Sequence, residues 1–132
     1  MNANSPDDLV AEMASALHDL SVDVEKYAKQ LTKSVEAQND FREAYAKAYL
    51  LETSSGRKAT VAEIDARISE QVAPLKRAAD IAEALAKATR ESMDVDRRRI
   101  EVAQSILAFA RTELEHTSAQ VPLVRDRDWR AI

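Results

Sequence analysis

The sequence predicts an all-α protein: a long helical hairpin whose copies pack into a multi-helix, coiled-coil-like oligomeric bundle. The 132-residue chain contains one glycine and three prolines. A sheet protein needs turn residues about every 8–12 positions, so this chain has too few for that class. Alanine, glutamate, lysine, arginine and leucine dominate the chain, a composition typical of long helices. Apolar residues also recur at spacings of three and four over long stretches, which is the helical period.

The first helix is predicted over residues 6–52. Ser5 can cap its start, Pro6 suits the first helical position, and the acids at 7 and 8 face the positive end of the helix dipole. Seven apolar residues then follow at alternating spacings of three and four: Val10, Met13, Leu17, Leu20, Val24, Tyr27 and Leu31. This pattern indicates one seam for a neighbouring helix.

Residues 53–60 are predicted to form the elbow of the hairpin. They include the sole glycine, Gly56, a residue suited to the left-handed conformation that ends a helix. Thr60-Val61-Ala62-Glu63 has the spacing of a capping box, so the second helix is predicted over residues 61–117.

Pro74 interrupts the second helix. The residue before it, Ala73, is a poor cap, which favours a kink over a break. Residues 1–119 then form a single helical-hairpin domain, and residues 120–132 form a C-terminal tail. The tail carries the only tryptophan, Trp129, and is either a peptide that docks on a partner or a frayed end folded back on the bundle.

The second helix carries two apolar stripes. The first keeps spacings of three and four from Val72 to Leu114, and the second lies one residue earlier. One hairpin covers one stripe on each helix, so the second stripe would be an exposed apolar surface on a monomer. We therefore expect it to form the interface between copies: Ile81, Leu85, Val95, Val102, Ile106 and Phe109. The alternative is a monomeric three-helix bundle with the chain broken at Pro74.

No catalytic, metal-binding or cofactor-binding residue is predicted. The chain lacks cysteine, and it contains no phosphate-binding loop, dinucleotide glycine motif or nucleophile elbow. Glu113 and His116 have the Glu-x-x-His spacing of di-iron bundles, but such sites need two copies of it. No apolar run approaches the roughly 18 residues of a membrane span, and the polar N-terminus does not resemble a signal peptide. A cytoplasmic location without membrane binding is expected.

Basic residues are candidates for contact with nucleic acid. Net charge is −4, but all six charges of residues 1–25 are acidic, whereas residues 26–132 carry 19 bases against 17 acids. Phosphate groups bind ionised, flexible donors of the kind found at these positions: Arg57, Lys58, Lys76, Arg77, Lys87, Arg90, Arg97, Arg98 and Arg99. The alternative is that these bases form a solvated face of the bundle.

The elbow also carries a resemblance. Ala44-Tyr45-Ala46-Lys47-Ala48-Tyr49, followed by Ser55-Gly56-Arg57, resembles the elbow of the phage UvsY-like recombination mediators, and the likeness of layout covers most of residues 20–115. The resemblance implies a ring-like homo-oligomer that binds single-stranded DNA and helps to load a recombinase, in the host cytoplasm if the chain is phage-encoded. Arg57 and Lys58 are the positions it singles out.

Two functions are therefore expected from the sequence. The first is a non-enzymatic, oligomeric accessory protein of phage DNA recombination or replication that binds single-stranded DNA, a recombinase, or both. The alternative is a protein-binding helical adaptor, scaffold or inhibitor that does not bind nucleic acid.

Overall fold

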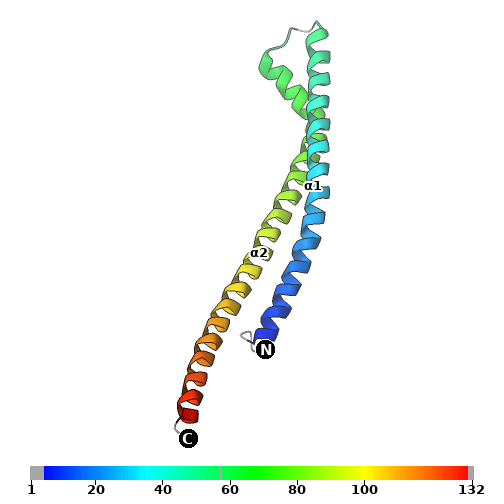
Figure 1. Cartoon of the computed structure of the whole chain (residues 1–132). Helices are drawn as coiled ribbons and strands as arrows, with labels where there is room; N and C mark the ends of the chain where they lie inside the picture. Colours follow the sequence, from blue (N-terminus) through cyan, green and yellow to red (C-terminus); the bar gives the residue numbers. More distant parts are fainter. Residues whose placement is uncertain (1–4, 57, 131–132) are drawn as a thin grey trace. The chain divides into compact units, whose positions relative to one another are not determined.

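In the computed structural model, two long helices pack against each other as a hairpin: α1 (Pro6–Ser54) and α2 (Val61–Arg130) (Figure 1). The structure describes the backbone of residues 5–56 and 58–130, and the side chains of residues 5–56 and 58–117. No strand occurs within these ranges. The all-α hairpin predicted from the sequence is confirmed.

Capping interactions explain where the helices begin and end. The Leu9 N–H donates to the Ser5 carbonyl at 3.0 Å, which starts α1. Near its end, the Ser55 hydroxyl donates to the Glu52 carbonyl at 2.8 Å, and so satisfies one of the carbonyls left without a helical partner. Gly56 then takes the left-handed conformation, with φ of 70°. Across the elbow, Thr60 Oγ1 accepts from the N–H of Glu63 at 3.2 Å, as the capping-box sequence predicts.

Pro74 lies inside α2, and the helix continues through it. A proline removes one backbone donor and crowds the preceding turn, which bends a helix without necessarily ending it. Figure 1 shows the first turns of α2, in green, running at an angle to the turns that follow. The predicted kink is therefore present, and the break required by the three-helix alternative does not occur.

At its carboxyl end, α2 extends to Arg130, well past the expected end at residue 117. The expectation rested on the fading of the apolar pattern. That pattern reports packing, whereas a helical backbone needs residues that favour the helix, and this segment holds Ala119, Gln120, Leu123 and three arginines. The side chain of Trp129 lies outside the described residues, so its docking role stays a prediction.

The hairpin divides into two compact units, each built from part of both helices. One unit comprises Met1–Ser21 with Asp94–Ile132, and the other comprises Val22–Met93. The second unit has a small apolar core in which Ile68 is fully buried beside Ala48 and Val72. Four partly buried side chains close this core: Phe41, Ala44, Tyr45 and Ile64.

Tyr45 joins the apolar core to a polar contact at its edge. Its ring lies 6.2 Å from that of Phe41, and its hydroxyl donates to Asp65 at 3.2 Å. Desolvation, followed by the hydrogen bond to Asp65, raises the pKa of Tyr45 above its ordinary value. The protonated phenol is therefore the favoured form in the folded chain. The stability that it contributes is lost only when the pH rises above the ordinary pKa of tyrosine.

The contact face of α1 differs from the predicted seam. Four residues of the predicted stripe are about half exposed: Val10, Leu17, Val24 and Leu31. The buried positions instead include Leu9, Ala16 and Ser34, which belong to a row one residue out of phase. Both rows share Met13, Leu20 and Tyr27, so the spacing of apolar residues fits either one. The observed row has small side chains, which allow close approach, and polar ones that pair with α2.

Replacing Ile68 with alanine is expected to lower the free energy of unfolding by about 2–5 kcal/mol, because it opens a cavity in the core of Val22–Met93. Urea unfolding followed by circular dichroism measures the change. Val61→Ala is the matched control, since Val61 is 73% exposed. Equal effects of the two substitutions would contradict the burial of Ile68.

Candidate interaction surfaces

The second stripe of α2 faces solvent in the single chain. Its sixth member, Ile106, is half-buried. The other five side chains are 53–69% exposed: Ile81, Leu85, Val95, Val102 and Phe109. The first stripe, by contrast, supplies buried residues such as Ala79, Ala86 and Ala103 to the contact with α1. The expectation that one stripe packs within the hairpin while the other stays exposed agrees with this geometry. The role of the exposed stripe as an interface stays a prediction.

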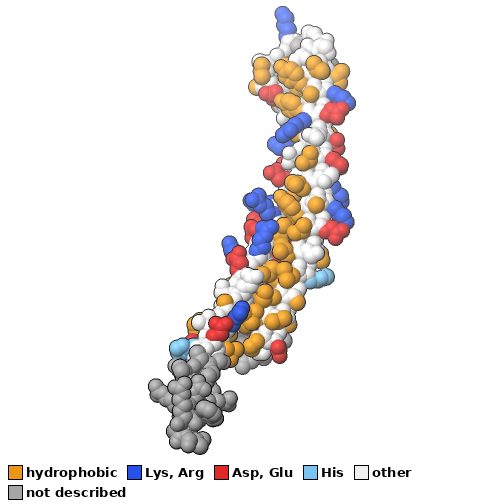
Figure 2. All heavy atoms as spheres, in the orientation of Figure 1, with side chains coloured by type: hydrophobic (Ala, Val, Ile, Leu, Met, Phe, Trp, Pro, Cys, Tyr) orange, Lys and Arg blue, Asp and Glu red, His pale blue; other side chains and the backbone are white. Residues whose placement is uncertain are grey.

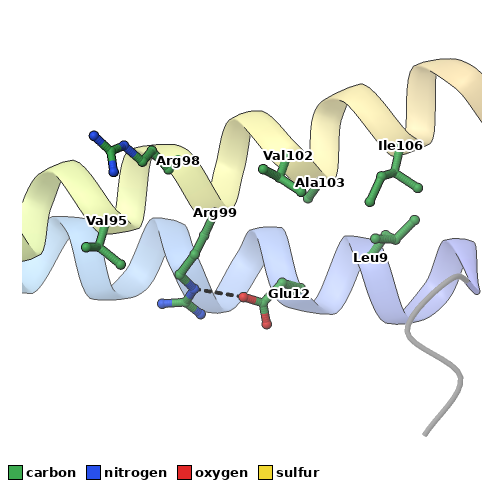
Figure 3. A pocket seen from close by; sticks show the side chains of 8 residues that line it. All are labelled: Leu9, Glu12, Val95, Arg98, Arg99, Val102, Ala103 and Ile106. Carbon is green, nitrogen blue, oxygen red and sulfur yellow. Dashed lines mark hydrogen bonds and ion pairs between the residues drawn. The ribbon is translucent and has the colours of Figure 1, made fainter.

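Within the first unit, part of this stripe borders an apolar groove of about 390 Å³. Leu9 of α1 and Val95, Val102, Ala103 and Ile106 of α2 supply its apolar lining (Figure 3). Three charged side chains complete the rim: Glu12, Arg98 and Arg99. Figure 3 shows Arg99 reaching from α2 to α1, whereas Arg98 does not point toward α1.

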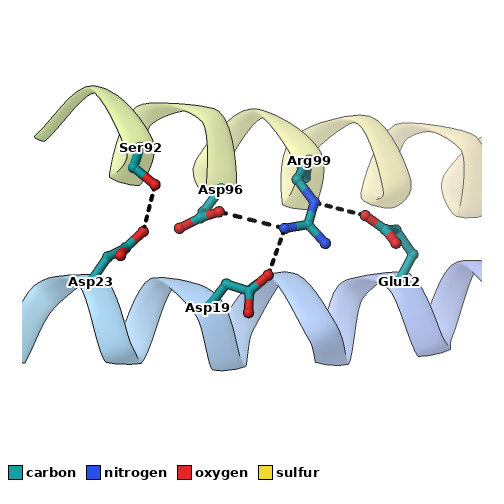
Figure 4. Close-up of polar contacts among 6 residues, drawn as sticks. All are labelled: Glu12, Asp19, Asp23, Ser92, Asp96 and Arg99. Atoms are coloured by element: carbon teal, nitrogen blue, oxygen red, sulfur yellow. Dashed lines mark hydrogen bonds and ion pairs between the residues drawn. The ribbon is translucent and has the colours of Figure 1, made fainter. Parts of the chain in front are cut away.

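Arg99 is held by three carboxylates (Figure 4). Its Nε donates to Glu12 at 2.8 Å, and its Nη1 donates to Asp19 at 2.8 Å and lies 3.5 Å from Asp96. The hydrogen bonds to Glu12 and Asp19 raise the pKa of Arg99 above its ordinary value. Asp96 is buried, so the guanidinium also balances a carboxylate that has little access to water. Arg99 was among the phosphate-binding candidates predicted from the sequence, but its donors already serve the contact between the helices.

Two further polar pairs join α1 to α2 within the second unit. The Ser92 hydroxyl donates to Asp23 at 2.8 Å (Figure 4), and the Thr89 hydroxyl donates to the Gln30 side chain. Such pairs set the register of the hairpin, because a shift of one residue would leave each polar group without its partner. Asp23 and Gln30 are seven residues apart, and so are Glu12 and Asp19. This heptad spacing was the sequence signal that the two residues of each pair share a face of α1 and can both reach α2.

A second groove, of about 410 Å³, lies within residues 22–93. From α1 it is lined by Tyr27, Leu31 and Val35 together with two polar residues, and from α2 by Lys87, Arg90, Glu83 and Ala86. Neither Lys87 nor Arg90 makes an ion pair or hydrogen bond with any residue whose side chain is described. These two cations therefore keep their donors available beside an aromatic ring.

Of the other predicted bases, those that the structure describes line neither groove. Arg57 lies outside the described residues, Lys58 belongs to the elbow, and Lys76 and Arg77 follow the kink. Arg97 lies 3.2 Å from Asp94. Figure 2 shows basic side chains interspersed with acidic ones on the face in view. The structure thus brings together Lys87 with Arg90 in one groove, and Arg98 with Arg99 in the other.

Glu113 and His116, the pair with Glu-x-x-His spacing, belong to no group of possible metal ligands among the side chains that the structure describes. Over residues 5–56 and 58–117, no group of three histidine or acidic side chains is placed to hold a metal ion. Over the same part of the chain, neither helix combines the length and apolarity needed to cross a membrane.

Comparisons with known protein families, curated proteins and solved structures gave no match to this chain. The resemblance to UvsY-like mediators therefore stays a prediction.

Substituting Arg99 with glutamine is expected to destabilise the fold, because three neighbouring carboxylates lose their shared cation. Because the pKa of Arg99 is raised, the stability that its charge contributes is fully present at every pH below the ordinary pKa of arginine. The loss of stability in the variant should therefore be constant across neutral pH. Thermal unfolding at pH 7 and pH 8 measures it. Arg98→Gln is the control: Arg98 has no ion pair or hydrogen bond with a described side chain, so its loss should leave stability nearly unchanged. An equal loss in both variants would contradict the assignment.

Proposed function

We propose that this chain is a non-enzymatic helical accessory protein that assembles with copies of itself and, in that assembly, binds a macromolecular partner. The exposed apolar stripe of α2 is the observation that carries the proposal. Soluble monomers rarely leave a long apolar row open to water, and such rows mark surfaces that pack against other chains. The side chains of the stripe follow a helical spacing suited to another helix rather than to a small molecule.

Self-assembly through α2 should be sensitive to a single buried charge. Val102→Asp is expected to weaken self-association at least tenfold, because the carboxylate would be taken from water into an apolar interface. Light scattering across a concentration series measures the effect. Val61→Asp is the matched control, since it makes the same change at an exposed position outside the stripe. A wild-type chain that is monomeric at every concentration would refute the proposal.

The partner class favoured by the sequence is single-stranded DNA, with a recombinase as the candidate protein partner, in phage recombination or replication. The groove that contains Tyr27, Lys87 and Arg90 supports contact with DNA. Cations with free donors bind phosphates, and aromatic faces stack on unpaired bases. Repetition of this groove in each copy of an oligomer would multiply a modest affinity.

An oligonucleotide titration tests the proposed binding of single-stranded DNA. Binding of a labelled single strand is expected to fall as salt rises, and Lys87→Gln with Arg90→Gln should weaken it at least tenfold at low salt. The charge-matched control is Lys29→Gln with Lys47→Gln, because those lysines already pair with Glu25 and Glu43 on the helix surface. Equal losses in the two double variants would remove the groove from the proposal.

The protein-binding adaptor is the second candidate, and the groove of the first unit favours it. An apolar lining with Arg98 on its rim suits a helix that carries an acidic residue beside its apolar face. An oligomer that binds no oligonucleotide even at low salt would favour this function over DNA binding.

A further inference from the structure

Helix α1 carries a second row of side chains that α2 does not cover. Eight positions at alternating spacings of four and three hold only apolar or small residues, and all eight are exposed: Val10, Ala14, Leu17, Ser21, Val24, Ala28, Leu31 and Val35. The five large members are 46–57% exposed. Because α1 is unbroken over Pro6–Ser54, this spacing keeps the row on one face of one helix.

The side chains of this row are complementary in size to those of the same row on a second, antiparallel copy of α1. In an antiparallel pair centred on residues 21–24, Leu17 meets Ala28 of a second copy, and Ala14 meets Leu31. Ser21 then meets Val24, and the two valines at the ends, Val10 and Val35, meet each other. Nearly every layer thus places a large side chain against a small one, which allows two helices to approach closely without voids. A parallel pair would place large against large and small against small.

The charges along α1 also favour the antiparallel arrangement. Residues 1–25 hold six acids and no base, so a parallel pair would set these acids against each other. The antiparallel register instead places this segment beside residues 20–44, which hold five acids and four bases, so the two facing stretches repel each other less. At each end, Asp7 of one copy comes within about one turn of Arg42 of the other. Neither Asp7 nor Arg42 has an ion-pair or hydrogen-bond partner among the residues that the structure describes.

We propose that α1 pairs with α1 of a second copy through this row, antiparallel and in the register that sets Leu17 opposite Ala28. The inference rests on the proposed self-assembly, and it names a second copy of this chain as the occupant of the row. The contact from Val10 to Val35 covers 26 residues, or about 39 Å of helix.

This contact leaves the exposed stripe of α2 free. Within residues 22–93, Leu31 and Val35 line one groove, whereas Leu85 lines a different groove together with Asp23 and Lys26. A chain can therefore use both rows at the same time. Two distinct two-fold contacts per chain build either a closed tetramer or an open filament.

Cysteine cross-linking tests the register directly, because the chain has no cysteine of its own. The double variant Leu17→Cys with Ala28→Cys should form a disulfide-linked dimer under mild oxidation, at least tenfold more than either single variant. Peptide mapping should show a bond between positions 17 and 28. The two positions are about 16 Å apart along one helix, so the bond cannot form within a chain.

A register control uses Leu17→Cys with Val10→Cys, which lie on the same row but about 27 Å out of alignment in the proposed pair. This variant should cross-link no more than the single variants. Bonds between two copies of position 17 would indicate a parallel pair and overturn the inference, as would the absence of cross-links. Light scattering on the same samples separates the two proposals: an oligomer without the 17–28 bond refutes only the α1 pairing, whereas a monomer refutes both.

Discussion

Two helices that pack side by side bury only one stripe of each, because a single neighbour covers a limited part of a helix's circumference. In this chain both helices have more apolar surface than one neighbour can cover. The contact between α1 and α2 uses Ala16, Ala79, Ala86 and Ala103, whereas larger side chains such as Val102 and Phe109 remain in water. Small residues bring the helices together, and most of the large ones remain exposed.

Polar interactions between the helices determine which face of α1 packs against α2. The row of α1 that packs on α2 includes Asp23 and Gln30, which pair with Ser92 and Thr89. In the other unit, Arg99 on α2 bonds to Glu12 and Asp19 of α1. A purely apolar row would fit many registers, whereas each of these pairs fits one. The hairpin thus gains a defined register from polar pairs that are exposed or partly buried, and the cleaner apolar row of α1 stays exposed.

This selection also explains how much of the structure was predictable. The scarcity of glycine, the capping box at Thr60 and the left-handed Gly56 were enough to predict two helices and their elbow, because these are local features. The face of α1 was not predictable from spacing, since both rows keep the same period and share Met13, Leu20 and Tyr27. The pairing of Arg99 was hidden for a related reason: a run of three arginines looks like a phosphate site until the carboxylates of the facing helix are placed beside one of them.

The same reasoning bears on function. A chain that assembled through α2 alone would gain nothing from an eight-residue row of small and apolar side chains on α1, and random surface positions would hold charges there. Charges do occupy the rest of the α1 surface, for example at Glu25, Lys29 and Glu36, which are exposed and lie off the row. The absence of charge from these eight positions supports the proposal that both rows are surfaces for packing. An assembly that uses both would place the groove of Tyr27, Lys87 and Arg90, whose lining includes Leu31 and Val35 of the α1 row, directly beside the contact between copies. In the proposed assembly the basic groove and the self-association surface would be physically coupled, and ligand binding in that groove should depend on whether α1 is paired.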